Sequence, residues 1–389
     1  MFPTRRIITS GGDVFRDEYS LAFDGTNDYI TLPPSNVLFN GTNVTVAVWF
    51  KVDDTDAATL FHNQKDAGST HFALIANYKS SGAAAGHVGL LTWNGLSHDW
   101  LDYDGNVDAD GKWHHLVGTV SNGAQRLYLD GIEVATPGEA AFGTNASANL
   151  SYIGSLNGAS NFLGGNVSEV VQYDTVLAPS QVKTIYNNRE PYNHKEGITK
   201  KSGNLKAWWR MGDGALDGFS RTTASELSGN GQGAIQDMIL PSLTDVVTGW
   251  TNVDFDTCTI SGLDVSSAIS DGSASHEFSS NAIDATAGDL LEISFTIAGS
   301  LIPSNDKLLF KLSPNADLNS AVFDCKINAV GEYHFYAAFT ATDSSSYVGI
   351  RSAAEASNFS MTNFRCRKFE GNVGQMTNMA ADDFEGDTP

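Results

Sequence analysis

The chain has 389 residues, of which 41% are hydrophobic, and its 45 acidic residues against 23 basic ones give a formal net charge of −22. At about 150 residues per domain, this length predicts two or three domains. Because phosphate recognition needs clustered Lys and Arg, the acidic balance excludes nucleic acid or an anionic membrane surface as the main partner. No window is long and apolar enough for membrane insertion, and the first residues lack the apolar core of a signal peptide.

The first 17 residues predict a basic arm on an acidic body. They contain Arg5, Arg6 and Arg16, and Gly11-Gly12 would act as a flexible joint. Such an arm suits docking on an acidic partner, such as a capsid or tail surface, with an affinity that falls as salt rises. The alternative is that this segment begins the first sandwich as an edge strand.

Residues 113–134 carry the clearest pattern of the chain and predict a three-strand meander. Side chains alternate along 116–121 and 126–129, which is the period-two signal of half-buried strands. Asp130-Gly131 then supplies the two positive-φ positions of a tight hairpin. Similar patterns predict further strands over 21–30, 44–50, 152–154 and 165–173.

Residues 177–186 predict the one clear helix, because a proline lies near the start and the apolar residues have helical spacing. A polar connection follows, and then a strand over 205–214 and a Gly-rich turn over 227–233. In that strand we expect Trp208 and Trp209 to differ, one being buried and one exposed.

A second all-β unit is predicted over 249–370. Apolar residues alternate with other residues along several of its segments, as strands with one buried face require, and a closing strand completes the unit. These segments are 291–297, 308–312, 333–339 and 359–369.

The three cysteines, Cys258, Cys325 and Cys366, all lie in the C-terminal half. An odd count without metal-ligand spacing predicts buried, reduced thiols. A bridge between Cys258 and Cys366 is the alternative, because the first and last strands of such an all-β unit often lie side by side.

The strands around the meander, in this order, resemble a laminin-G-like, concanavalin A-like jelly roll over roughly residues 18–190. The Phe23-Asp24-Gly25 and Trp113-His114-His115 sequences contribute to the resemblance. It implies a lectin-type sandwich of two curved antiparallel sheets and a structural role for the two histidines, whereas periodicity alone predicts only a sandwich or a barrel. The unit over 249–370 resembles a carbohydrate-binding-module-like, galactose-binding-like jelly roll, a fold that does not by itself define a function.

Together these resemblances imply an all-β fold of two antiparallel jelly-roll sandwiches joined by a short helix and a Gly-rich connector. The expected divisions are an N-terminal arm (1–17), a laminin-G-like jelly roll (18–190), a connector with a docking strand (191–248), a carbohydrate-binding-module-like jelly roll (249–370) and a C-terminal tail (371–389).

The tail carries a further resemblance. Residues 229–238 are echoed by 371–379, and the tail sequences Met376-Thr377-Asn378-Met379 and Asp387-Thr388-Pro389 resemble the ending of laminin-G-like virion proteins of marine bacteriophages. The second jelly roll is therefore expected to be a module set between two halves of that ending.

Two sets of acidic residues are candidates for Ca²⁺. In the resembling family the Asp of the Phe-Asp-Gly motif and an acidic pair in the last strand often hold a structural ion; Asp24 and Glu169 match, but Ser168 stands where an Asp is common. The second set fails the EF-hand pattern, which favours a solvated turn over an ion site. It comprises Asp102, Asp104, Asn106, Asp108 and Asp110.

A cluster of aromatic and acidic residues before the meander is the candidate carbohydrate site. An exposed tryptophan face can stack on a sugar while carboxylates accept hydrogen bonds from its hydroxyls. The alternative is a rim of core aromatics under a long loop. The cluster comprises Trp93, His98, Asp99, Trp100, Asp102 and Tyr103.

The sequence predicts no enzyme. Glycosidases of the lectin-like fold place carboxylates on one face of one strand, whereas Glu169 and Asp174 differ in parity and face opposite ways. A nucleophile elbow, a His-Glu-x-x-His motif and a phosphate loop are absent from the sequence.

These observations predict a non-enzymatic bacteriophage virion surface protein, a capsid decoration or fibre-type component. Its expected partners are other virion proteins of capsid or tail and, through the lectin-like domains, host polysaccharide, and several copies or a homo-oligomer are expected on each particle. The alternatives are a bacterial carbohydrate-binding adhesin, which would normally need an export signal, and a glycoside hydrolase of the same fold.

Overall fold

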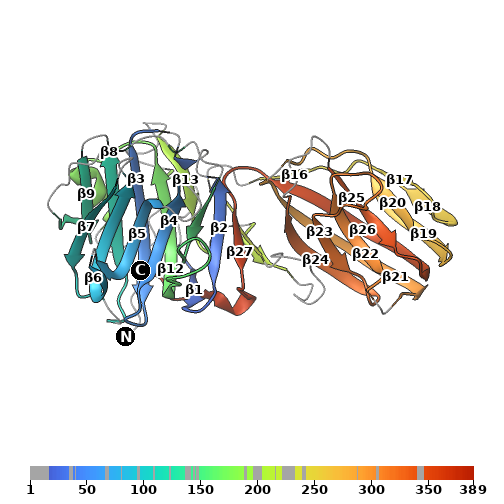
Figure 1. Cartoon of the computed structure of the whole chain (residues 1–389), viewed down its shortest axis with the longest axis horizontal. Coiled ribbons are helices and arrows are strands. Elements are labelled where there is room, and N and C mark those ends of the chain that lie inside the picture. Colours follow the sequence, from blue (N-terminus) through green and yellow to red (C-terminus); the bar gives the residue numbers. More distant parts are fainter. Residues whose placement is uncertain are drawn as a thin grey trace. The chain divides into compact units, whose positions relative to one another are not determined.

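The computed structural model describes most of the chain (Figure 1). Most of the basic arm, including Arg5, Arg6 and Arg16, and nearly all of the Gly-rich turn lie outside the described residues, as does Asp108. The described residues are 17–34, 38–39, 41–65, 70–79, 81–93, 97–107, 110–121, 124–135, 142, 145, 149–187, 191–195, 204–214, 216–220, 233–238, 242–286, 288–303, 306–339 and 346–389.

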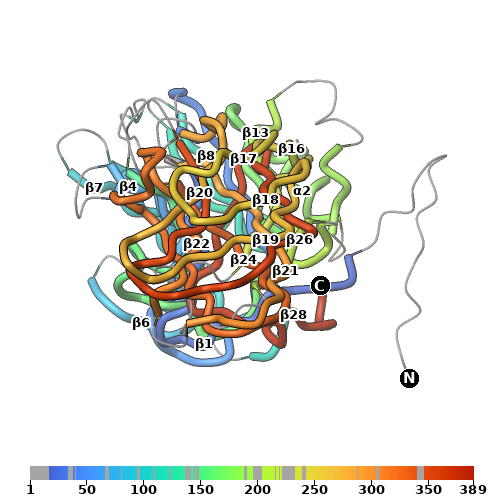
Figure 2. Tube along the Cα trace, turned by 90° about the vertical axis from the view of Figure 1, so that its right-hand side faces the viewer, coloured from blue at the N-terminus to red at the C-terminus, as the bar shows by residue number. Residues whose placement is uncertain are grey.

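The chain divides into two compact units. The first comprises residues 1–217, 235–241 and 378–389, and the second comprises 218–234 and 242–377. After the second unit the chain returns to the first, where the C-terminal strand β28 pairs with β1 (Figures 1 and 2). The sequence-based divisions at 190 and 371 are therefore too narrow for the first unit, because segments assigned to a connector and a tail are part of its structure.

The first sheet of the first unit is antiparallel, with the strand order β10-β9-β8-β3-β12-β1-β28 and with β13 also beside β12. Its strands are β1 (Ser20–Asp24), β3 (Val44–Val52), β8 (His114–Ser121), β9 (Ala124–Leu129), β10 (Ile132–Glu133), β12 (Gly164–Tyr173), β13 (Leu205–Trp209) and β28 (Phe384–Glu385).

The second sheet of this unit runs in the order β2-β11-β4-β5-β6-β7, again with antiparallel neighbours. Its strands are β2 (Tyr29–Pro34), β4 (Ala58–Gln64), β5 (Thr70–Lys79), β6 (Gly82–Trp93), β7 (His98–Asp104) and β11 (Leu150–Ile153).

The two sheets pack face to face at Gly118 of β8. A Cβ atom at Gly118 would lie 2.9 Å from Leu74, 3.1 Å from Leu90 and 3.2 Å from Phe72. Phe72, Leu74 and Leu90 belong to β5 and β6 of the second sheet, so their side chains fill the interior of the sandwich. Alternation along a strand then places the residues between them on the opposite, outer face of the sheet.

The single strand predicted over 21–30 is wrong, because the chain turns at Gly25 and changes sheets. Gly25 has φ of 74°, and the Asp24 carboxylate accepts hydrogen bonds from the backbone N–H groups of Thr26 (2.7 Å) and Asn27 (3.0 Å). A carboxylate that satisfies two backbone donors closes a turn. Residues before the turn therefore form β1 in the first sheet, and residues after it form β2 in the second.

The meander and its hairpin are confirmed as β8, β9 and β10. Asp130 and Gly131 have φ of 49° and 77°, and Leu129 pairs with Ile132 across them. The Asp130 carboxylate also accepts the backbone N–H of His115 at 2.9 Å. The Asp-Gly sequence therefore sets both the reversal of the chain and its attachment to β8.

The predicted helix is confirmed as α2 (Pro179–Tyr186), with Pro179 in its first turn and Asn187 in the left-handed conformation at its end. Val182 and Ile185 of α2 are buried on the outer face of the first sheet. The helix is thus part of the first unit and does not join the two units.

The expectation that Trp208 and Trp209 differ in burial is wrong. Both are buried, at 1% and 0% exposure, because β13 is covered on both sides. Trp208 lies in the cluster that α2 covers. Trp209 points the other way along the strand, into the sandwich.

The second unit is a sandwich of two antiparallel sheets, in the orders β18-β19-β26-β21-β24, with β16 beside β26, and β17-β20-β25-β22-β23. The predicted strands 291–297, 308–312 and 359–369 lie within β21, β22 and β26, and 333–339 lies within β24 except for its last residue. The strands are β16 (Leu243–Asp245), β17 (Trp250–Asn252), β18 (Thr257–Ser261), β19 (Asp264–Asp271), β20 (His276–Ser280), β21 (Leu290–Leu301), β22 (Leu308–Ser313), β23 (Phe323–Lys326), β24 (Gly331–Ala338), β25 (Tyr347–Ser352) and β26 (Ala356–Phe369).

Short elements complete the chain. β14 (Gly218–Phe219) pairs with β15 (Gly233–Ile235). The last residues form β27 (Gly374–Thr377), the 3-10 helix η2 (Ala381–Asp383) and β28. Among the residues that the model describes, no helix has the length and apolar character needed to cross a membrane. The predicted all-β class with two antiparallel sandwiches is therefore confirmed.

All three cysteines are reduced, as the odd count predicted. Cys258 in β18 and Cys366 in β26 are separated by β19, so their strands lie about 9.6 Å apart. A disulfide requires Cα atoms closer than about 7 Å, which excludes the alternative of a Cys258–Cys366 bridge. Burial raises the pKa of Cys258 to about 11, so its thiol stays protonated at neutral pH.

We predict that Gly131→Ala destabilises the first unit more than Gly111→Ala does. Both glycines have positive φ, 77° and 68°, so both substitutions carry the same backbone strain of about 1 kcal/mol. A Cβ atom at Gly131 would lie 2.8 Å from the Tyr186 ring, whereas Gly111 has nothing within 4 Å. The contact should add about 1–3 kcal/mol to the loss in urea unfolding. Equal losses would show that Tyr186 moves away freely.

Candidate functional site

The outer face of the second sheet in the first unit carries the candidate carbohydrate site. The register aligns Ala73 of β5, Leu91 of β6 and Trp100 of β7 in one row across the sheet. This row is one residue out of step with the interior residues Leu74 and Leu90, so it faces away from the sandwich interior.

Trp100 and Tyr78 form an aromatic pair on this face. Their ring centroids are 5.5 Å apart at an interplanar angle of 27°, and both rings pack over the buried Ala73, Ile75 and Leu91. Both residues are only partly buried. The pair therefore offers a supported aromatic surface that still contacts solvent.

Polar groups lie beside this pair along β6 and β7. His87 faces two carboxylates, with its Nδ1 atom 3.7 Å from Asp102 and its Nε2 atom 3.9 Å from Asp104. Asp102 and Asp104 follow Trp100 at two-residue steps, so all three project from the same face of β7. Aromatic carbon and hydrogen-bonding groups thus lie next to each other.

Trp93 and His98 lie on the same face, at the turn end of the β6–β7 hairpin. They are paired in the register, and their rings meet edge to face with centroids 4.8 Å apart. The Lys65 ammonium lies 4.8 Å from the centroid of the Trp93 ring. A cation–π contact of this kind occupies the ring of Trp93, which leaves Trp100 and Tyr78 as the better platform.

The structure separates the six residues predicted for this site. Trp93, His98, Trp100 and Asp102 share the outer face. Asp99 and Tyr103 have the opposite parity and pair with residues whose side chains line the interior, Thr92 and Val88.

The separation of Asp99 and Tyr103 from the other four corrects the prediction that all six act together. Three residues of the face were not predicted: Tyr78, His87 and, as a sugar contact, Asp104. The sequence analysis identified no strand over 70–93, so the cross-strand neighbours of β7 could not be found.

The structure does not bring together Asp24 and Glu169, the residues predicted to hold Ca²⁺. Asp24 pairs with Gly164 at the start of β12, five residues before Glu169 in the same strand. At about 3.3 Å per residue, the two positions are about 16 Å apart. Asp24 instead caps the turn between β1 and β2, and the carboxylates of the acidic loop approach His87, Lys112 and His114. A structural Ca²⁺ remains a prediction, without support from this pairing.

Glu169 lies instead in a buried ionic cluster around Arg210. The Arg210 guanidinium is 3.5 Å from Glu169, 3.3 Å from Asp213 and 3.9 Å from Asp17. The Ser168 hydroxyl donates to Asp17 at 2.9 Å. All three carboxylate side chains are at most 7% exposed.

The charge balance of this cluster is acidic. Burial raises the pKa of Asp17 well above its ordinary value, and the neighbouring Glu169 and Asp213 carboxylates raise it further. The His194 ring lies 3.8 Å from Glu169 and contacts the Tyr173 hydroxyl. We assign the cluster a structural role, because its buried charged groups pair with one another within the first sheet.

The adjacent histidines of the meander have different environments, consistent with structural roles. His115 is buried against Trp49 and Tyr186, and burial lowers its pKa to about 3. Burial also opposes the charged form of His114, but the Asp130 and Asp110 carboxylates outweigh it and raise the pKa of His114. Each ring is thus committed to packing or to an ion pair.

The comparisons with known proteins agree with this geometry. Residues 24–183 match the laminin-G-like family described as the concanavalin A-like lectin/glucanases superfamily. The matched segment covers most of the two sheets of the first unit, which therefore carries the laminin-G-like, lectin-type sandwich. No curated protein shows significant sequence similarity to the chain.

Three solved structures illustrate the structural similarity. A heptameric SAP-like pentraxin from Limulus polyphemus matches at 18% identity over 44% of this chain and 82% of its own, with a TM-score of 0.36. A putative carbohydrate binding protein from Bacteroides ovatus matches at 14% identity over 59% of this chain and 60% of its own, with a TM-score of 0.40. Domain 4 of an extracellular arabinanase from Geobacillus stearothermophilus, in complex with arabinotriose, matches at 23% identity over 43% of this chain and 76% of its own, with a TM-score of 0.33.

We predict that Arg210→Met costs about 3–5 kcal/mol of unfolding free energy at pH 7, because it leaves buried carboxylates without their cation. The matched control is Arg126→Met, which removes an ion pair to Glu133 from a side chain that is 39% exposed and should cost less than about 1 kcal/mol. The difference should shrink as pH falls, since the carboxylates then become neutral. Equal costs in urea unfolding would contradict the role assigned to the cluster.

Proposed function

We propose that the first unit binds carbohydrate on the outer face of its second sheet. The observation that carries the proposal is the partly exposed Trp100–Tyr78 pair with His87, Asp102 and Asp104 beside it. The lectin-type fold supports carbohydrate binding in general. The chemistry of this face supports it at these residues.

A neutral sugar suits this arrangement. The C–H face of a pyranose ring buries apolar area on an aromatic ring, and carboxylates accept hydrogen bonds from hydroxyl groups. Because this contact needs no charge on the ligand, the affinity should change little with salt. A single platform of this size supports weak binding, which several copies on one particle would strengthen.

Binding without cleavage is the second part of the proposal. Asp102 and Asp104 lie two residues apart on one face of β7. We therefore compare them with the catalytic carboxylate pair of a glycosidase. Retaining glycosidases use carboxyl groups about 5–5.5 Å apart, one of them a general acid held in a desolvated pocket. The Asp104 side chain is 63% exposed, which does not provide such a pocket.

The biological setting that we propose is the surface of a bacteriophage virion, as a capsid decoration or fibre-type component without enzymatic activity. The resemblance of residues 376–379 and 387–389 to the ending of virion proteins supports it, and the acidic composition is compatible with a soluble multicopy surface. The partners would be capsid or tail proteins and host-surface polysaccharide. A bacterial carbohydrate-binding adhesin is the alternative.

We predict that Trp100→Ala weakens binding to polysaccharide fragments by about 1–3 kcal/mol, enough to abolish a millimolar interaction. The matched control is Tyr103→Ala, which removes an aromatic ring from the other face of the same strand and should leave binding unchanged. Glycan arrays followed by calorimetry on laminarin, agar and alginate fragments provide the measurement, with melting temperatures checked for each variant.

The same incubations test the absence of catalysis. No new reducing ends should appear with the wild-type protein. Turnover that disappears in Asp102→Asn or Asp104→Asn would establish a hydrolase instead. Equal binding by the wild type and Trp100→Ala would place any sugar contact elsewhere in the molecule.

We predict that peptides of this chain co-purify with phage particles through a density gradient. Mass spectrometry of the particle fraction gives the measurement, and quantification against the major capsid protein gives the copy number. Recovery of the chain only with the cell envelope of a bacterial host would favour the adhesin and contradict the virion assignment.

A further inference from the structure

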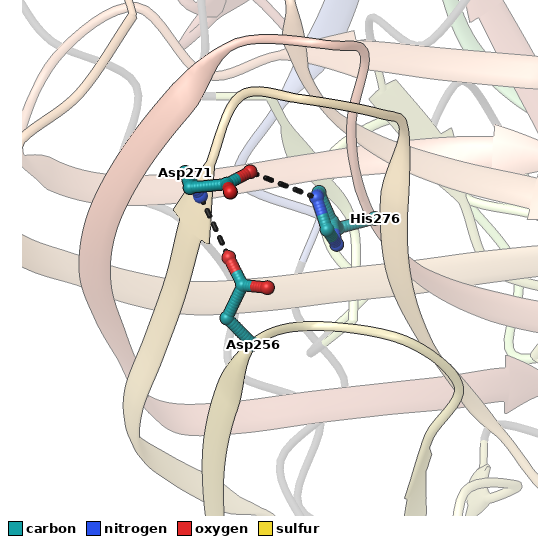
Figure 3. Close-up of side chains that lie close together, drawn as sticks. All are labelled: Asp256, Asp271 and His276. Carbon is teal, nitrogen blue, oxygen red and sulfur yellow. Dashed lines mark hydrogen bonds and ion pairs between the residues drawn. The ribbon is translucent and has the colours of Figure 1, made fainter.

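Three segments of the second unit bring two carboxylates and a histidine together. Asp256 directly precedes β18, Asp271 ends β19, and His276 begins β20 (Figure 3). β18 and β19 belong to one sheet of the sandwich, whereas β20 belongs to the other. The three side chains therefore meet where the chain passes between the sheets.

The His276 ring is held in one orientation. Its Nδ1 atom lies 2.7 Å from the backbone carbonyl oxygen of Asp254, and because a carbonyl only accepts, Nδ1 carries the proton that is donated. In the neutral ring the Nε2 atom then has a free lone pair. A histidine whose Nδ1–H is fixed by a carbonyl is the usual arrangement of a metal ligand.

The Nε2 atom of His276 points toward the two carboxylates and is buried without a hydrogen-bond partner. The residue is 6% exposed. The Asp271 carboxylate lies 3.8 Å away, and the ligand atoms of all three residues lie within 4.8 Å of one another. A buried lone pair facing carboxylate oxygens is unfavourable unless a proton or a metal ion lies between them.

The carboxylates are also positioned by the backbone. Asp256 accepts the N–H of Asp271 at 2.7 Å, and Asp271 accepts the N–H of Ser273 at 2.7 Å. The Ser273 side chain also hydrogen-bonds Asp271. Because each carboxylate oxygen has two lone pairs, both carboxylates still have acceptor sites for a ligand beside these bonds. The turn thus orients two exposed carboxylates toward one buried ring nitrogen.

We propose that Asp256, Asp271 and His276 bind one divalent transition-metal ion of the Zn²⁺ type. Imidazole nitrogen favours Zn²⁺, whereas Ca²⁺ and Mg²⁺ prefer ligand sets made of oxygen alone. Tetrahedral Zn²⁺ places its ligand atoms about 3.4 Å apart, so the three atoms, which lie within 4.8 Å of one another, need to close by at most about 1.4 Å. The exposed carboxylates can rotate to do so, and water completes the coordination.

The ion would hold together three segments that come from both sheets of the second unit. An ion that binds the folded state and not the unfolded state stabilises the fold as its concentration exceeds the dissociation constant. The expected role is structural, and it is independent of the carbohydrate site proposed for the first unit.

The test is a titration of the full-length, tag-free protein with ZnCl₂ by calorimetry, with melting followed in parallel. The wild type should bind Zn²⁺ at this site and melt at a higher temperature in its presence. Asp256→Asn and Asp271→Asn keep the acceptor oxygens that the backbone uses but lose the charge. Each should weaken binding by more than about a hundredfold, since even second-shell changes cost 10–100-fold.

The matched control is Asp264→Asn, which removes the same charge from an exposed residue at the other end of β19 and should bind Zn²⁺ like the wild type. His276→Asn retains a donor for the Asp254 carbonyl and should lose binding. If the buried His276→Asn change unfolds the unit, the exposed variants Asp256→Asn and Asp271→Asn still test the proposal. Equal Zn²⁺ binding by wild type and the two exposed Asn variants would overturn the proposal. So would the absence of a thermal shift, or Ca²⁺ or Mg²⁺ binding at the same residues in place of Zn²⁺.

Discussion

The first sheet depends on how two strands share one edge of β12. β1 pairs with its first half up to Val167, and β13 pairs with its second half from Val170. Between the two ladders lie Ser168 and Glu169, at the same point where the register with β3 on the other edge shifts. Polar groups that no neighbouring strand covers need other partners when they are buried. Asp17, just before β1, and Arg210, just after β13, supply them.

This arrangement explains why Glu169, a carboxylate in the most buried strand of the sheet, has a structural role. All ten residues of β12 are buried, so Glu169 can remain charged only beside a cation. Arg210 fills that role and simultaneously holds Asp213, whose carboxylate accepts the backbone N–H of Glu18. The proposed carbohydrate face lies on the other sheet, where Asp102 and Asp104 lie beside His87 and contact solvent.

Sequence patterns recovered the parts of the fold that depend on local chemistry. The Asp130-Gly131 hairpin, the helix after Pro179 and the alternating strands of the second unit all follow from residue types at fixed spacing. The turn at Gly25 was missed because the prediction placed the five polar residues between the apolar runs 21–23 and 29–30 within one long strand. Parity within β7 could have separated Asp99 and Tyr103 from Trp100, but which parity faces outward depends on the facing sheet. The meeting of Asp256, Asp271 and His276 depends on two sheets and could not be read from spacing.

The return of the chain to the first unit sets an order for its synthesis. β28 pairs with β1, yet more than 350 residues separate them in the sequence, and the second unit is made in between. Domains tend to fold as units while the ribosome elongates the chain. The second sandwich can therefore complete its sheets while the first still lacks an edge strand, so the unit that begins first finishes last. Until β28 is made, the open side of β1 is exposed, and the acidic charge of the chain would then help to keep nascent copies from pairing with one another.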